Sequence, residues 1–169
     1  MNLGTLLKAR DMNRVQNIIL NPDFQQILQE MQELEKTRQF CRHDLPHLLD
    51  TARIAYILSL ERWTGHQKDV IYAAALLHDI GRVREYRDGS PHDKVGAQMA
   101  VPILEAAGYQ PQEIDQIVAA IAGHREVLHT DSLGDLLYQA DKASRCCFVC
   151  PVRSACSWSE DQKNSKIYW

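Results

Sequence analysis

Histidine and aspartate side chains recur in this sequence where a helical chain would bury them. His78 and Asp79 stand next to each other directly after residues 70–77, "VIYAAALL", a run that is apolar on every side. His47 shares one helical face with apolar residues, His124 follows isoleucines three and seven residues earlier, and Asp141 follows leucines four and eight residues earlier. Four separate segments therefore each direct an ionisable group inward. Because an unpaired buried carboxylate is costly, these groups must pair with each other or bind a cation.

The set of side chains indicates which cation would suit them. Two carboxylates and several imidazoles form a nitrogen and oxygen ligand set that suits Mn²⁺, Fe²⁺, Co²⁺, Ni²⁺ or Zn²⁺. The alternative is that each inward histidine is only a hydrogen-bonded core residue, which for any one of them alone is the commoner case. The combination of His47, the His78–Asp79 doublet and Asp141 is much more specific than any member, and it predicts a metal site.

The elements that must position these residues are helices. Helical periodicity dominates the chain, and it predicts helices over residues 21–39, 45–63, 67–80, 92–109, 110–127 and 131–146. Asn21 and Asp44 are expected to cap two of them, and either Asp131 or Ser132 a third. Gly81 should stop the buried helix, and Pro102 should kink or split another. Residues 1–20 are either a further helix or a loose arm. The prediction is an all-α, single-domain bundle of about six helices.

Composition narrows the classes of partner. The chain has 169 residues, of which 45% are hydrophobic and 24% charged, which is typical of one soluble globular domain. Its 19 basic and 22 acidic residues give a net charge of −3, so neither a nucleic acid nor a membrane is the expected partner. Without a signal-peptide pattern the expected location is the cytoplasm. The oligomeric state stays open.

The pattern resembles the HD-domain metal-dependent phosphohydrolase superfamily, whose signature is H…HD…D on separate helices. His47 matches within "HLLDTARIA", His78 and Asp79 within "ALLHDIGR", and Asp141 within "LLYQADKASR". The resemblance covers roughly residues 45–145. It implies an HD-type helical bundle in which these four residues bind the metal.

Two further histidines follow from the same resemblance. "PHDKVGAQMA" is similar to the segment that supplies an additional ligand in binuclear members, which gives His92, and "IAGHREV" is similar to another, which gives His124. In such members the residue matching Asp79 bridges two metals. Some have a His-His pair where this chain has His124-Arg125, which would leave one ligand fewer. The single histidines are loosely similar to the HD-type hydrolases that split bis-nucleoside tetraphosphates, which hints at a nucleotide substrate.

The resemblance implies a divalent-metal-dependent phosphohydrolase. Metal-activated water would attack a nucleotide or another small phosphate ester, with one or two ions of Mn, Fe, Co, Ni, Zn or Mg. Asp79 and Lys142 would be catalytic, and Arg82 and Lys142 would bind phosphate, although Arg82 could equally be a solvated surface charge. The alternatives are an HD module that binds a nucleotide or signal without turnover, a diiron HD oxygenase, and an interaction protein organised by its cysteines.

His43 stands four residues before His47 and could imitate a ligand pair on one helix. Pro46 argues against this, because the residue before a proline is disfavoured in helical geometry. We expect His43 behind the ligands or at the rim of the site.

Cysteines suggest a second site. Four of the five fall within residues 146–156, and the fifth is Cys41. Cys147, Cys150 and Cys156, with Cys41 or Cys146 as the fourth ligand, could hold a structural zinc ion or an iron–sulfur cluster. Reduced, partly buried thiols are an equal alternative, because a second Cys-x-x-Cys pair is absent. The expected organisation is a helical extension over residues 1–40, an HD-type core over 41–145 and a cysteine-rich tail over 146–169 packed on the core.

Overall fold

The computed structural model describes residues 12–125, 130–167 and 169, and the regular elements among them are helices. These residues contain no strand, so the all-α prediction is confirmed. None of their helices is both long enough and apolar enough to cross a membrane. The elements are α2 (Asn13–Leu20), α3 (Pro22–Leu34), α4 (Leu45–Glu61), α5 (Lys68–Leu77), α6 (Arg82–Asp88), α7 (His92–Ala107), α8 (Pro111–Gly123), α9 (Leu133–Ala143) and two 3₁₀ turns, η1 (Cys147–Val149) and η2 (Arg153–Ala155).

Six of these helices were predicted, and α2 and α6 complete the bundle. Helix α2 lies in the N-terminal segment for which both a helix and an arm were considered, while residues 1–11 lie outside the described residues. Helix α6, "RVREYRD", was missed because it has only seven residues and one buried side chain, Val83. Its short polar sequence carries no helical stripe that could have revealed it.

The predicted caps are present, and one of them positions a candidate ligand. Asn21 accepts hydrogen bonds from two backbone amides at the start of α3, and Ser132 accepts one at the start of α9. At the start of α4 the Asp44 carboxylate accepts a hydrogen bond from the His47 amide at 3.1 Å. This cap satisfies one of the unpaired amides of the first turn. It also fixes the start of α4, and with it the position of His47 in the first turn.

Pro102 does not split its helix, because α7 runs from His92 to Ala107. A proline inside a helix leaves the carbonyl four residues earlier without its usual partner. That residue is Gln98, and both Gln98 and Pro102 are exposed on the solvent side of α7. Water can therefore hydrate this part of the backbone, and the helix continues.

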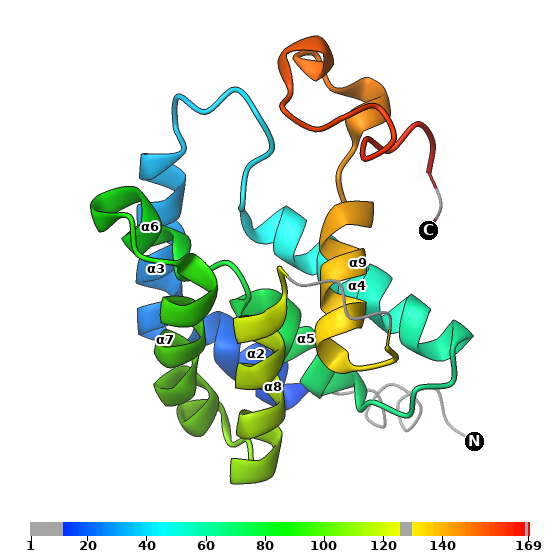
Figure 1. Ribbon diagram of the computed structural model, residues 1–169. Coiled ribbons are helices and arrows are strands. Elements are labelled where there is room, and N and C mark those ends of the chain that lie inside the picture. The colour runs from blue at the N-terminus through cyan, green and yellow to red at the C-terminus, as the bar shows by residue number, and fades with distance from the viewer. Residues whose placement is uncertain (1–11, 126–129, 168) are drawn as a thin grey trace, which may run out of the picture.

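Helix α5 lies at the centre of the bundle, with α4, α7, α8 and α9 packed around it (Figure 1). Seven of its ten residues are buried, and three of these are consecutive alanines. Small side chains let the neighbouring helices come close, so the end of α5 reaches the middle of the molecule. The connection between α3 and α4 and the C-terminal tail lie at the same end of the bundle (Figure 1).

The side chain of Asn164 holds the tail against the end of α9. The Asn164 amide nitrogen donates hydrogen bonds to the carbonyls of Lys142 at 2.9 Å and Arg145 at 2.7 Å. Each carbonyl also accepts a hydrogen bond from a nearby backbone amide, that of Arg145 at 3.3 Å and that of Cys147 at 3.0 Å, so Asn164 adds a second hydrogen bond to each. Asn164 therefore connects the tail to the last turn of α9, which carries Asp141.

Candidate metal centre

Four buried residues predicted to bind a metal come together at the end of α5. His47 projects from α4, His78 caps the C-terminus of α5, Asp79 lies in the following turn, and Asp141 projects from α9. One ligand atom from each lies within 4.8 Å of the others. His78 Nε2 is 2.9 Å from Asp79 Oδ2, and His47 Nε2 is 3.3 Å from Asp141 Oδ1. We call these four residues the first group.

A second group shares Asp79 with the first. It consists of Asp79, His92 at the start of α7 and His124 at the end of α8, with ligand atoms again within 4.8 Å of one another. The Nε2 atom of His92 is 3.7 Å from Asp79 Oδ1, whereas the Asp79 contacts with the first group use Oδ2. The two carboxylate oxygens of Asp79 therefore face different groups. This is the arrangement expected of a bridging ligand.

The histidine rings are held so that their Nε2 atoms face the centre. The Nδ1 atoms of His78 and His124 lie 2.7 and 2.6 Å from backbone carbonyls one turn earlier, and His92 Nδ1 lies 2.9 Å from the carboxylate of Glu85. A ring whose Nδ1 donates a proton to such an acceptor presents its other nitrogen as a ligand. Helix ends and one carboxylate thus orient three of the imidazoles.

Several buried atoms of the two groups form no well-directed hydrogen bond among the described residues, although His78 Nε2 and Asp79 Oδ2 lie 2.9 Å apart. They are Nε2 of His78, Nε2 of His92 and Oδ2 of Asp79. A buried polar atom without a partner costs about 1–3 kcal/mol. These atoms all point into the same small region, and their nitrogen and oxygen chemistry suits a divalent transition metal. The residues present therefore fit a metal centre.

Charge within the groups is strongly coupled. Burial alone would raise the pKa of Asp79, but the positive charges of His78 and Arg82 hold this pKa well below its usual range. Burial lowers the pKa of His78, but the neighbouring Asp79 and Asp141 carboxylates outweigh it and raise this pKa to about 9. Burial and the charge of His78 lower the pKa of His124 to about 4. A metal that binds His78 must displace its proton, so metal affinity should fall as the pH falls.

Two predicted phosphate-binding residues stand next to these ligands and line one cavity of about 290 Å³. Arg82 Nε donates to Asp79 Oδ1 at 2.8 Å, and Arg82 Nη1 donates to Glu85 at 3.0 Å. Lys142 Nζ is 2.7 Å from Asp141 Oδ2, and 41% of its side chain is exposed. Arg82 is therefore fixed in place, whereas Lys142 is more accessible.

Arg145 was not predicted as a site residue, yet it contacts two candidate ligands. Its Nη2 donates to Asp141 Oδ1 at 2.9 Å and lies 3.0 Å from His47 Nε2, and the residue is 8% exposed. The signal was present in the sequence, because Arg145 follows Asp141 by four residues and such residues share one face of a helix.

Glu35 was also missed, and it explains the position of His43. The two side chains lie 2.5 Å apart through Glu35 Oε1 and His43 Nδ1, and Tyr86 donates to the same carboxylate at 2.6 Å. Burial favours a raised pKa for Glu35, but its bonds to His43 outweigh this and lower the pKa to about 2. His43 Nε2 lies 4.0 Å from Asp79 Oδ2. His43 is thus buried behind the first group and belongs to neither group.

The cysteines of the predicted thiolate site are less closely grouped than the histidines and aspartates of the two groups. Cys41, Cys147, Cys150 and Cys156 line the same cavity as Asp141 and Lys142. Among the described residues, however, no cysteine belongs to a set of three ligand atoms within 4.8 Å of one another. The thiols are therefore not at the spacing of a tetrahedral zinc site, and metal binding here stays a prediction.

Glu85→Gln should weaken the second group selectively. The change removes the carboxylate that orients His92, and loss of such an outer partner typically costs roughly 10–100-fold in metal affinity. Titration with Mn²⁺ should show one weakened site and one unchanged site. Glu105→Gln is the matched control, because Glu105 is exposed near the other end of α7. Equal weakening of both sites would contradict the assignment of His92 to a separate group.

Comparison with known proteins agrees with this geometry. The family model "HD domain" matches residues 45–150, which contain every member of both groups. An uncharacterized protein of Clostridium beijerinckii is 38% identical over 158 residues, covering 94% of this chain and all of that protein. A predicted HD superfamily hydrolase from an uncultured Thermotogales bacterium, known from its crystal structure, has a TM-score of 0.60 and 25% identity, covering 96% of this chain and 87% of that one.

More distant similarity reaches two named enzymes. Ribonuclease Y of Clostridium kluyveri is 27% identical over 118 residues, and a bifunctional uridylyltransferase/uridylyl-removing enzyme of Gluconobacter oxydans is 29% identical over 91 residues. These matches cover 70% and 54% of this chain but only 21% and 9% of those enzymes. The long match to the family model and the likeness to the Thermotogales structure decide the assignment: this chain belongs to the HD-domain family.

Proposed function

We propose that this protein is a divalent-metal-dependent phosphohydrolase that acts on a nucleotide or another small phosphate ester. The observation that carries the proposal is Asp79, whose two oxygens face two groups of buried ligands that include unpartnered imidazole nitrogens. Such a centre beside a cationic cavity is suited to hydrolysis at phosphorus.

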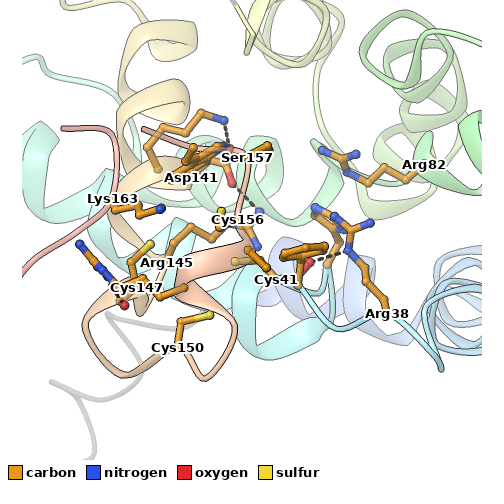
Figure 2. Close-up of a pocket in the computed structure, with 16 residues that line it drawn as sticks. Arg38, Cys41, Arg82, Asp141, Arg145, Cys147, Cys150, Cys156, Ser157 and Lys163 are labelled. Atoms are coloured by element: carbon orange, nitrogen blue, oxygen red, sulfur yellow. Dashed lines mark hydrogen bonds and ion pairs between the residues drawn. The ribbon is translucent and has the colours of Figure 1, made fainter. Parts of the chain in front are cut away.

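The cavity next to the centre is strongly basic. Its lining includes one carboxylate and six cationic side chains, Arg38, Arg82, Lys142, Arg145, Arg153 and Lys163 (Figure 2). The whole chain carries −3, so this positive charge is concentrated locally. Phe40 and Trp158 also line the cavity, and aromatic faces of this kind stack on nucleotide bases. The lining therefore favours a phosphorylated substrate that carries a base.

The metal would supply Lewis acidity and lower the pKa of a bound water toward neutrality. His47, His78, Asp79 and Asp141 would hold one ion, and Asp79, His92 and His124 a second. Arg82, fixed between Asp79 and Glu85, presents its guanidinium at the cavity without further ordering. Arg82 and Lys142 would bind the phosphoryl oxygens and stabilise negative charge that builds up in the transition state. Water is the nucleophile in this scheme.

The named relatives support the class of reaction. Their names describe a predicted hydrolase, a ribonuclease and a uridylyl-removing enzyme. These names agree with water attacking a phosphate ester, and none of them supplies the substrate for this chain, which spans only small parts of the latter two enzymes.

A phosphate-release screen with Mn²⁺, Mg²⁺, Co²⁺ or Ni²⁺ tests the proposal. Nucleotides, dinucleoside polyphosphates and phosphomonoesters should be compared, and at least one class should be hydrolysed. Arg82→Gln should lower kcat/KM by roughly 100-fold, since removal of one charge-stabilising donor has this effect. Arg84→Gln should leave it unchanged, because Arg84 lies on the same helix with 53% of its side chain exposed.

The same screen separates the main alternative. Calorimetric titration of the nucleotides should be run beside it on the same protein. Tight nucleotide binding without hydrolysis under every metal would contradict the enzyme and favour a binding module.

A further inference from the structure

Four cysteines from two distant parts of the chain line the cavity beside the metal centre. Cys41 comes from the connection between α3 and α4, and Cys147, Cys150 and Cys156 come from the tail. In Figure 2 these four residues surround Arg145, while Arg82 stands at the other side of the view. Burial is the main cause that raises the pKa of the Cys41 thiol, and the other three thiols raise this pKa further. The four sulfurs therefore share one electrostatic environment.

The tail that carries three of these cysteines has no hydrophobic core of its own. The apolar core cluster of the described residues includes no residue after Ala140. Beyond it Cys147 is the one buried hydrophobic residue, whereas Val149 is 72% exposed. Among the described residues, the regular structure of the tail consists of the two three-residue 3₁₀ turns η1 and η2. Segments that bury so little apolar surface are usually held by disulfides or a metal, and all five cysteines are free here.

Cations are buried around the thiols. Arg145 and Lys163 are each only 8% exposed and line the same cavity, together with Arg153. Arg145 pairs with Asp141, and Lys163 and Arg153 both pair with Glu160, so these three cations share two carboxylates. A buried cation requires a negative partner nearby. Thiolates bound to a metal cluster would provide that charge.

The spacing of the thiols separates the two kinds of metal. Zinc–sulfur bonds of about 2.3 Å in a tetrahedron place thiolates about 3.8 Å apart. No three ligand atoms that include a cysteine lie even within 4.8 Å of one another in the described residues. In a four-iron cluster each thiolate binds a different iron, so the sulfurs stand farther apart around a larger body. The four cysteines line one cavity without this close spacing, which suits the larger cluster better than a single ion.

We propose that Cys41, Cys147, Cys150 and Cys156 bind a four-iron, four-sulfur cluster. Cys146 is excluded because it does not line this cavity. The cluster would join the α3–α4 connection to the tail. Since Asp141 and Lys142 line the same cavity, it would also form one wall of the proposed substrate site. The proposal does not depend on hydrolase activity.

The test is purification of the full chain without oxygen, followed by assay of iron and acid-labile sulfide. Equal amounts of iron and sulfide, with visible absorption that dithionite bleaches, are expected. Cys150→Ser should lose the sulfide and the absorption, while Cys146→Ser should keep both. Asp79→Asn should also keep both, so loss of the histidine–aspartate centre can be told apart from loss of the cluster.

Other results would overturn the proposal. Zinc without sulfide, or no metal at the thiols after anaerobic incubation with ferrous iron and sulfide, would exclude the cluster. So would a Cys146→Ser variant that loses sulfide as fully as Cys150→Ser. If Cys150→Ser does not fold, Cys41→Ser replaces it, because Cys41 lies outside the tail in an irregular connection. A Cys41→Ser protein with unchanged sulfide would contradict the four-cysteine assignment.

Discussion

Asp79→Asn is expected to abolish metal binding at both groups and to lower phosphate release by at least ~100-fold. Loss of a residue that only orients a metal ligand already costs up to about 100-fold in metal affinity or activity, and Asp79 would be a ligand itself. Asp79 is the one residue that both groups share. The amide keeps the shape of the side chain but removes its charge and one acceptor oxygen, so neither group can retain its full ligand set. Metal analysis after dialysis and the phosphate-release assay measure the two effects.

Asp50→Asn is the matched control for this change. Asp50 also lies on a helix of the centre, α4, but its side chain is 52% exposed and pairs with Arg53. Circular dichroism in EDTA should show that both variants are folded. An Asp79→Asn protein that keeps its metal content and its activity would refute the bridging role and the mechanism built on it.

Gly81→Ala should destabilise the fold by about 3 kcal/mol or more, which is the upper range for overpacking a well-packed interior. A Cβ atom at Gly81 would stand 2.0 Å from the His92 carbonyl oxygen and 2.6 Å from the Gly96 amide nitrogen. Both obstacles are backbone atoms of α7, so no side-chain rotation relieves the overlap. A loss of this size should lower Tm by roughly 10 °C for a chain of this length.

The matched control is Gly123→Ala at the end of α8. A Cβ atom there meets nothing within 4 Å, so the change should be neutral or stabilising by up to about 1 kcal/mol. Thermal unfolding of both variants in EDTA measures the difference without any contribution from metal. Equal Tm values for the two variants would show that the α6–α7 contact can relax and would contradict the prediction.

Gly81 was predicted to end the buried helix, but the sequence does not reveal why a glycine is needed there. The sequence predicts that Gly81 stops the buried helix, and α5 ends before it, at Leu77. Gly81 itself has φ −69°, a value open to any residue, so its backbone freedom is not needed. It is small because α7 passes against it. Packing between helices distant in sequence is not visible in a local pattern.

The inward positions of the candidate ligands could be predicted because they follow helical periodicity. Asp141 lies on the buried stripe of α9, and His78 and Asp79 follow the most apolar helix, so spacing alone places them inward. No apolar stripe precedes His92, so its role as a candidate ligand was predicted only from the resemblance to the HD-domain superfamily. Glu35 and Glu85 could not be predicted, because their roles arise from α3 and α6 packing against the centre. Their own sequences look like ordinary charged helix surface.

His43 lies between these cases. The expectation that His43 lies outside the helix that carries His47 is right, because α4 begins at Leu45, although Leu45, the residue before Pro46, is itself helical. This expectation cannot place the side chain of His43, which the buried Glu35 carboxylate draws to within 4.0 Å of Asp79. The cysteines stay predictions for a related reason, because their spacing along the chain does not fix the spacing of their sulfurs.

The cap that Asn164 places on α9 has a consequence for how the protein matures during synthesis. The carbonyls of Lys142 and Arg145 each accept one hydrogen bond from a nearby backbone amide, and Asn164, far downstream, adds a second to each. While residue 164 is still inside the ribosome, the end of α9 lacks the hydrogen bonds from Asn164, and Asp141 and Arg145 lie at this end beside His47. We therefore expect the surroundings of Asp141 to reach their final arrangement only after residue 164 has left the ribosome.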